Sequence, residues 1–163
     1  MVIGYTTGVF DLFHVGHVNL LRNAKDLCDK LIVGVSTDDL AGYKNKRPVI
    51  PFEERIAVVR ACRHVDLAVP QENMDKLDAR ARYKFNIMMV GDDWYANPRW
   101  DEYEKALAEH DVTVVYLPYT KTTSSTLITQ TLWRLRTASG LNEPGSNDFG
   151  QRHLKNASGV AVK

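Results

Sequence analysis

What the chain lacks narrows the class of protein that it can be. It has only two cysteines, Cys28 and Cys62, both within helical patterns. We therefore expect each thiol to be a small buried hydrophobe and expect neither a disulfide nor a cysteine zinc site. No apolar run approaches the roughly 20 residues that cross a bilayer, and no basic region followed by a long apolar stretch opens the chain. Membrane insertion and a signal peptide are not expected, and a cytoplasmic location is.

The chain also lacks an excess of charge of either sign. Its 21 Lys and Arg residues balance 20 Asp and Glu residues, for a formal net charge of +1. Proteins that bind nucleic acid or an anionic membrane surface through their overall charge carry a clear basic excess. We therefore expect no nucleic-acid partner, and any site for an anion must be local.

The apolar residues fall into short runs that alternate with helical patterns. The runs, which predict strands, are 2–5, 31–35, 66–69, 87–90 and 112–117. The patterns that predict helices are 14–28, 51–64, about 73–84, 100–109 and 125–137. Short runs without strict alternation are typical of strands buried on both faces. The alternation predicts an α/β fold, Rossmann-like and doubly wound, with a mostly parallel five-stranded sheet and helices on both faces.

Composition changes near the end of the last expected helix. From about Thr137 onward, glycine, proline, serine and asparagine dominate and few apolar residues remain to be buried. We therefore expect one domain over residues 1–137, followed by an irregular tail over 138–163. In such sheets ligands bind beyond the carboxyl ends of the strands, so the loops that follow the strands are where a site is expected.

The loop after the first strand ends in two histidines at the start of a helix. Its sequence over residues 8–17 is GVFDLFHVGH. His14 and His17 are three residues apart and share one face of the helix. A helix N-terminus carries partial positive charge and free N–H groups, so we expect an anion site here. Two alternatives are a zinc site, for which no third ligand is evident, and histidines that cap a helix in a non-catalytic nucleotide-binding domain.

Two further loops carry polar residues of the kind that ligands need. The loop after the second strand holds three cations within four positions, Lys44, Lys46 and Arg47. This is either a solvated basic turn or a clamp over a polyphosphate. The loop after the fourth strand contains Gly91 and Asp93 beside a second acid. Paired acids there either hold a metal, a ribose or a base, or cap the next helix.

The loop after the fifth strand is rich in hydroxyl side chains between Thr120 and Thr126. One hydroxyl is enough to cap the helix that follows, so several are spare. With the free N–H groups of that helix they predict a second anion cradle. Two anion cradles and a lysine loop at one edge favour a nucleoside triphosphate over a small acid.

Taken in order, these motifs resemble those of the HxGH nucleotidyltransferases. Residues 8–17 are similar to the GxFDxxHxGH motif, specifically that of the cytidylyltransferase family, and the resemblance covers about residues 2–135. The serine-threonine-aspartate at 36–38, the lysine pair and the GDDW at 91–94 are also where that family has its motifs. Tyr119 and Thr122 stand where the pattern RTxGxSTT has arginine and glycine. Residues 47–55 look more like the heptose-phosphate adenylyltransferases of the same superfamily.

The resemblance implies an enzyme that condenses CTP with a small phosphomonoester, with glycerol 3-phosphate as the first candidate. In-line attack on the α-phosphate gives a CDP-linked product, a precursor of a cell-envelope polymer, and pyrophosphate. Because a phosphomonoester is mostly dianionic at pH 7, no general base is needed. Mg²⁺ is expected to accompany the triphosphate. The resemblance also suggests a homodimer through residues 63–70. The runner-up is a sugar-phosphate adenylyltransferase.

The residue roles follow from the same resemblance. Catalysis is assigned to His14, His17, Lys44 and Lys46. Nucleotide binding is assigned to Thr7, Gly8, Val9, Phe10, Gly16, Gly91, Asp93, Thr120, Ser124, Ser125 and Thr126. Binding of the second substrate is assigned to Asp11, Arg55, Arg63 and Lys121. Lys121 is also expected to supply the charge that the family's arginine would bring, and no metal held by protein side chains is expected.

Overall fold

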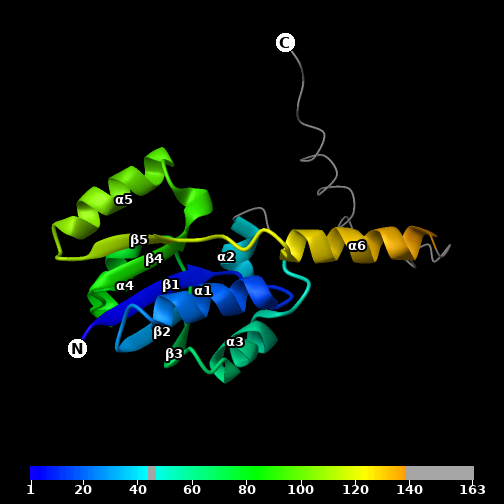
Figure 1. Ribbon diagram of the computed structural model, residues 1–163, viewed down its shortest axis with the longest axis horizontal. Coiled ribbons are helices and arrows are strands. Elements are labelled where there is room, and N and C mark those ends of the chain that lie inside the picture. Colours follow the sequence, from blue (N-terminus) through cyan, green and yellow to red (C-terminus); the bar gives the residue numbers. More distant parts are fainter. Residues whose placement is uncertain (44–46, 139–163) are drawn as a thin grey trace, which may run out of the picture.

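A computed structural model describes residues 1–43 and 47–138 of the chain as a parallel sheet wrapped by helices (Figure 1). The strands are β1 (Ile3–Gly8), β2 (Lys30–Ser36), β3 (Leu67–Gln71), β4 (Ile87–Gly91) and β5 (Thr113–Leu117). They are hydrogen-bonded in the order β3-β2-β1-β4-β5, and every neighbouring pair is parallel. The predicted doubly wound α/β fold is confirmed, and the sheet is wholly rather than mostly parallel.

The two faces of the sheet bury two separate cores. Successive side chains of a strand point to opposite faces, so Leu31 and Val33 pack on one side and Ile32 on the other. Helices α1 (Val15–Lys25) and α3 (Phe52–Ala61) cover the first face, and α4 (Lys76–Tyr83) and α5 (Pro98–Ala108) cover the second. Cys28 and Cys62 are free thiols, partly buried against the first core. No described helix is long and apolar enough to span a membrane.

Capping side chains fix where the helices of the second face begin. Asp75 accepts hydrogen bonds from the backbone N–H groups of the first turn of α4. Asn97 does the same for α5, which has Pro98 in its first turn, where the missing N–H of proline costs nothing. Pro51 stands immediately before α3, at the N-cap position. These helix starts all follow strand ends or loops at the carboxyl edge of the sheet.

One helix lies where the sequence predicted only a loop. Helix α2 (Asp38–Tyr43) is six residues long and follows directly after β2. Asp38 and Asp39 lie in its first turn, where acids favour a helix, while Leu40 and Ala41 are buried. Its single apolar pair is too short a pattern to reveal a helix in the sequence. Residues 44–46 and 139–163 lie outside the described residues, and the second range holds all of the expected tail except Ala138, which ends helix α6 (Ser125–Ala138).

The last element leaves the body of the domain. β5 leads through residues 118–124 into α6 (Ser125–Ala138), which projects beyond the end of the sheet (Figure 1). The start of α6 therefore lies near the loop between β1 and α1. A hydrogen bond from the Ser125 hydroxyl to the carbonyl of Asp11, 2.5 Å long, joins the two. This contact brings the first and last loops of the site together.

Candidate functional site

The two histidines cap the helix that they begin. His14 is the N-cap of α1, and its Nδ1 accepts a hydrogen bond of 3.0 Å from the Gly16 N–H. In return the Nδ1 of His17 accepts from the His14 N–H at 3.3 Å. A backbone N–H only donates, so both Nδ1 atoms are unprotonated and each neutral ring carries its hydrogen on Nε2. The backbone thus fixes both imidazoles as donors through Nε2.

This reciprocal capping changes the expectation that free backbone N–H groups at the start of α1 would bind an anion. The N–H of Gly16 is taken by His14 Nδ1, and the N–H of His17 is bonded to the carbonyl of His14. The start of α1 therefore offers an anion its imidazole N–H groups in place of these backbone donors. The capping role and the donor role of the histidines belong to different nitrogen atoms, so one does not exclude the other.

A steric reason explains why a glycine stands between the two histidines. A Cβ on Gly16 would lie 2.8 Å from Cε1 of His14, closer than real Cβ atoms approach, and 3.0 Å from its Nδ1. Any side chain there would push the His14 ring out of its capping position. The loop before it is strained as well, because Phe10 and Leu12 both have positive φ values, 54° and 47°. Such conformations in non-glycine residues gather at functional sites.

His17 is held by rings on several sides. Its ring centroid lies 4.0 Å from that of His14, 5.2 Å from Phe10 and 5.4 Å from Phe13. Burial, followed by the neighbouring His14, lowers the pKa of His17 to about 3, and burial also lowers the pKa of His14. Both rings are therefore neutral near pH 7. They can stabilise negative charge by hydrogen bonding without carrying a charge themselves.

The hydroxyl-rich loop gives its side chains different tasks. Ser124 caps α6 by accepting from the Leu127 N–H at 3.1 Å, and Thr120 accepts from the side-chain amide of Asn19 at 3.1 Å. Ser125 donates to the Asp11 carbonyl, as described above. The first intrahelical bond runs from Ile128 to Ser124, so the earlier N–H groups of α6 have no partner within the helix. With the Leu127 N–H taken by Ser124, the N–H groups of Ser125 and Thr126 are the ones that an anion could bind.

A cavity of about 190 Å³ lies between these two helix starts. The residues that line it are Val9, Phe10, Asp11, His17, Arg47, Pro48, Val49, Ser125, Thr126 and Thr129. Six of them were predicted from the sequence as site residues. Arg47 was seen only as part of a basic run, and Pro48, Val49 and Thr129 were missed as site residues. Pro48 and Val49 carry no polar side chain, so only the fold places them here.

Two predicted substrate ligands have their polar atoms bonded within the chain. Both carboxylate oxygens of Asp11 accept backbone N–H groups, from Val49 at 2.8 Å and from Ile50 at 2.9 Å. Arg55 is only 1% exposed. Its guanidinium donates to the carbonyls of Val9, Ser36 and Ile50 and to the carboxylate of Asp38, at 2.5–2.8 Å. These two side chains hold the segment that follows the lysine loop against the loop after β1.

The remaining predicted residues are more scattered. Asp93 folds its carboxylate over Gly91 at the end of β4. The neighbouring Asp92 accepts from the Tyr119 N–H at 3.0 Å, which ties this loop to the loop after β5. Lys121 lies in an exposed turn and does not line the cavity. Arg63 follows the end of α3 near the start of β3, at the opposite edge of the sheet. Lys44 and Lys46 lie outside the described residues.

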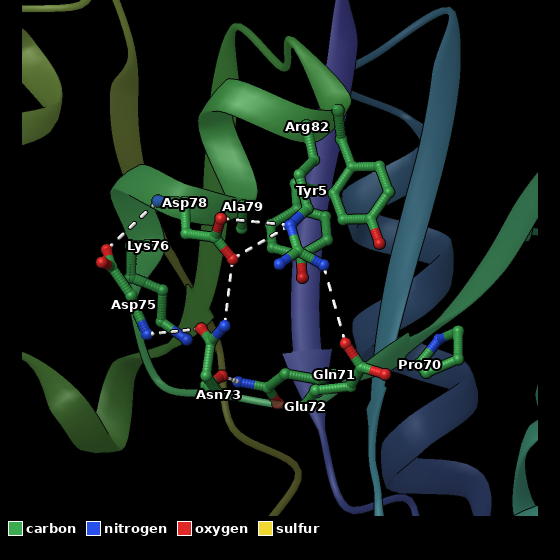
Figure 2. A pocket seen from close by; sticks show the side chains of 11 residues that line it. Tyr5, Pro70, Gln71, Glu72, Asn73, Asp75, Lys76, Asp78, Ala79 and Arg82 are labelled. Atoms are coloured by element: carbon green, nitrogen blue, oxygen red, sulfur yellow. Dashed lines mark hydrogen bonds and ion pairs between the residues drawn. The ribbon is translucent and has the colours of Figure 1, made fainter.

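A second hollow lies beside the end of β3 and the start of α4 (Figure 2). Its volume is about 20 Å³, room for roughly one water molecule and far less than a nucleotide needs. Arg82 bonds there to Asp78 at 3.1 Å and pairs with Glu72 at 3.6 Å, and Asn73 donates to Asp78 at 3.0 Å. These polar side chains bind one another, so the hollow is a network that holds the β3–α4 turn.

Comparison with known proteins is consistent with this geometry. The cytidylyltransferase-like family model matches residues 5–131. A glycerol-3-phosphate cytidylyltransferase from Staphylococcus aureus is 33% identical over 78% of this chain and 92% of its own length. An FAD synthase from Archaeoglobus fulgidus is 37% identical over 58% of this chain and 68% of its own.

Among solved structures, the lipopolysaccharide core biosynthesis protein from Thermoplasma volcanium superposes with a TM-score of 0.64 and 27% identity. That match covers 76% of this chain and 99% of the other. The family model spans the sheet, both histidines and the hydroxyl-rich loop, so it includes the elements that build the cavity. The resemblance read from the sequence is confirmed, and the chain belongs to the cytidylyltransferase-like family of nucleotidyltransferases.

Proposed function

We propose that this protein transfers a cytidylyl group from CTP to a small phosphomonoester, with glycerol 3-phosphate as the first candidate. The observation that carries the proposal is the pair of imidazoles whose Nδ1 atoms bind backbone N–H groups. Each ring keeps one donor, at Nε2, and His17 lines a cavity bordered by the start of α6. Neutral donors at fixed positions suit a reaction in which negative charge develops on phosphate oxygens.

The chemistry needs positioning more than proton transfer. An oxygen of the dianionic phosphomonoester attacks the α-phosphorus of CTP, and a new P–O bond forms. The bond from the α-phosphorus to the bridging oxygen of the β-phosphate breaks, and pyrophosphate leaves with its electron pair. His14 and His17 donate through Nε2 to the phosphate oxygens. No side chain has to accept a proton from the nucleophile, which explains a site without a general base.

The other groups hold the two substrates. Thr126 and the N–H groups at the start of α6 bind the outer phosphates, beside the backbone of Val9 and Phe10. Gly91 and Asp93, at the end of β4, lie toward the nucleoside. Lys44 and Lys46 remain predictions from the sequence, since they lie outside the described residues. Asp11 and Arg55 act by holding the loops in place, which is the role that their backbone contacts support.

Mg²⁺ fits this site as a companion of the triphosphate. No group of three or more His, Cys, Asp or Glu side chains that could hold a metal occurs among residues 1–43 and 47–138. The Asp11 carboxylate is already committed to two backbone N–H groups. The ion would therefore be bound mainly by phosphate oxygens and water, as Mg²⁺ usually is. When bound, it neutralises charge on the triphosphate.

Two observations support CTP and glycerol 3-phosphate, and one favours another nucleotide. The Staphylococcus aureus relative named for that activity is matched over nearly its whole length, and the family model bears the cytidylyltransferase name. The relative named FAD synthase makes a product that contains adenine and matches this chain at a similar identity. ATP is therefore the second candidate nucleotide, with a sugar phosphate or another phosphorylated acceptor.

The experiment is a pyrophosphate-release screen of the four nucleoside triphosphates against a panel of phosphomonoesters, each with Mg²⁺. We expect the fastest release with CTP and glycerol 3-phosphate, and almost none from His17→Asn, which lacks the Nε2 donor. Equal or faster release with ATP would overturn the choice of nucleotide. If His17→Asn released pyrophosphate as fast as the wild type, the proposed role of His17 would be overturned.

A homodimer through residues 63–70 and a cytoplasmic location complete the proposal. Much of that segment belongs to β3, an edge strand of the sheet, where Leu67 is 40% exposed. An exposed apolar side chain on an edge strand can be buried against a second copy of the chain. Light scattering of the purified protein measures the assembly, and a monomer at micromolar concentration would contradict the dimer.

A further inference from the structure

Among the described residues that line the cavity between α1 and α6, one side chain carries a permanent positive charge. Three of the residues that line it have ionisable side chains: Asp11, His17 and Arg47. The Asp11 carboxylate is taken by two backbone N–H groups, and the His17 ring is neutral with its Nδ1 bonded to the backbone. A triphosphate carries several negative charges, and neutral donors alone do not balance them. Arg47 is therefore the permanently charged side chain among the described lining of the cavity.

The backbone near Arg47 is fastened to the domain. Two residues further on, Val49 donates its N–H to Asp11 Oδ2 at 2.8 Å, and Ile50 donates to Oδ1 at 2.9 Å. The Ile50 carbonyl accepts from the Nε of the buried Arg55 at 2.8 Å. Pro48 also restricts Arg47 itself to extended backbone conformations. The arginine is thus presented from a segment that is positioned before a ligand arrives.

We propose that Arg47 is a phosphate-binding residue that holds the triphosphate of the nucleotide in the cavity shared with His17 and Thr126. This inference rests on the proposed function. The planar guanidinium matches two oxygens of a phosphate, which a lysine cannot do. Lys121, which the sequence suggested for this charge, lies in an exposed turn away from the cavity lining. The positive charge therefore comes from the segment after α2 and not from the loop after β5, where Tyr119 stands.

The test compares Arg47→Gln and Arg47→Lys with Arg60→Gln, a matched loss of an exposed arginine on α3. Calorimetric titration with CTP and with inorganic pyrophosphate, both with Mg²⁺, measures binding without turnover. We expect Arg47→Gln to weaken both affinities at least tenfold, Arg47→Lys to weaken them less, and Arg60→Gln to leave them unchanged. A thermal melt of each variant checks that the fold is retained before binding is compared.

Steady-state kinetics then separates the two substrates. We expect KM for the nucleotide to rise in Arg47→Gln, while KM for the phosphomonoester stays within twofold of wild type. Unchanged binding of both CTP and pyrophosphate would overturn the proposal, and a rise confined to the acceptor KM would assign Arg47 to the other substrate. If the wild type releases no pyrophosphate from CTP, the proposed function fails. Titration with pyrophosphate still decides the role of Arg47 in that case.

Discussion

Replacing Arg55 by methionine should destabilise the fold by about 3–4 kcal/mol. The guanidinium is 1% exposed and donates to three backbone carbonyls and to the carboxylate of Asp38. Hydrogen bonds to a charged group are worth about 1.5–3 kcal/mol each, and breaking a buried ion pair costs about 3–5 kcal/mol. Asp38 is half exposed and can regain water, so we take the lower part of that range. The methionine fills much of the vacated space, so the loss comes from the broken ion pair and the unpaired carbonyls rather than from a cavity.

Urea unfolding followed by circular dichroism at pH 7 measures this effect, and Arg60→Met is the matched control. Arg60 lies on the same helix but is exposed, so its loss should change the free energy of unfolding by less than about 0.5 kcal/mol. For a chain of this size, the Arg55 effect corresponds to a melting temperature lower by about 6–16 °C. If Arg55→Met matched the wild type in stability but raised KM for the phosphomonoester, the reasoning would fail. Arg55 would then be the substrate ligand that the sequence predicted.

Two further predictions concern a titrating group and a helix cap. Since the pKa of His17 is about 3 in the folded protein and near 6.5 in the unfolded chain, only the unfolded state gains its proton between those values. Acidification from pH 6.5 to 5 should therefore lower the free energy of unfolding by about 1.6 kcal/mol through this residue. That part of the pH dependence should be missing in His17→Asn, and an equal loss of stability in both proteins would contradict the prediction. Asp75→Ala removes the side chain that accepts from Leu77 and Asp78 at the start of α4 and should cost about 1 kcal/mol. The control is Glu102→Ala, which removes an exposed acid on α5 and should leave the free energy of unfolding almost unchanged in the same assay. An equal effect of the two substitutions would refute the capping argument.

Much of the fold could be predicted because its signals are local. Apolar runs of four to six residues marked all five strands, and the helical patterns marked α1, α3, α4, α5 and α6 to within a few residues. Helix α2 was missed because its six residues contain one buried apolar pair, Leu40 and Ala41, which gives no periodic pattern. Helix ends differed by up to three residues, as at Lys25, where turn residues continue the apolar pattern beyond the helix.

The candidate site was less predictable because it depends on contacts between distant segments. The sequence indicates that Asp11 and Arg55 are polar and lie in a motif, and it assigned both to the substrate. It cannot indicate that Val49 and Ile50, almost 40 residues after Asp11, would occupy that carboxylate. Arg47 appeared only as one member of a basic run, because its place in the cavity depends on the same long-range pairing.

The contacts of Asp11 and Arg55 show how the loops around the cavity are held in place. Arg55 donates to the loop after β1, to the end of β2 and to the segment after the lysine loop, so one side chain spaces three segments. Asp11 ties two of these segments to each other, and its carbonyl accepts from Ser125 at the start of α6. A reaction accelerated by positioning and charge stabilisation is sensitive to displacements of an ångström. Residues that never touch a substrate are therefore expected to affect turnover as strongly as those that do.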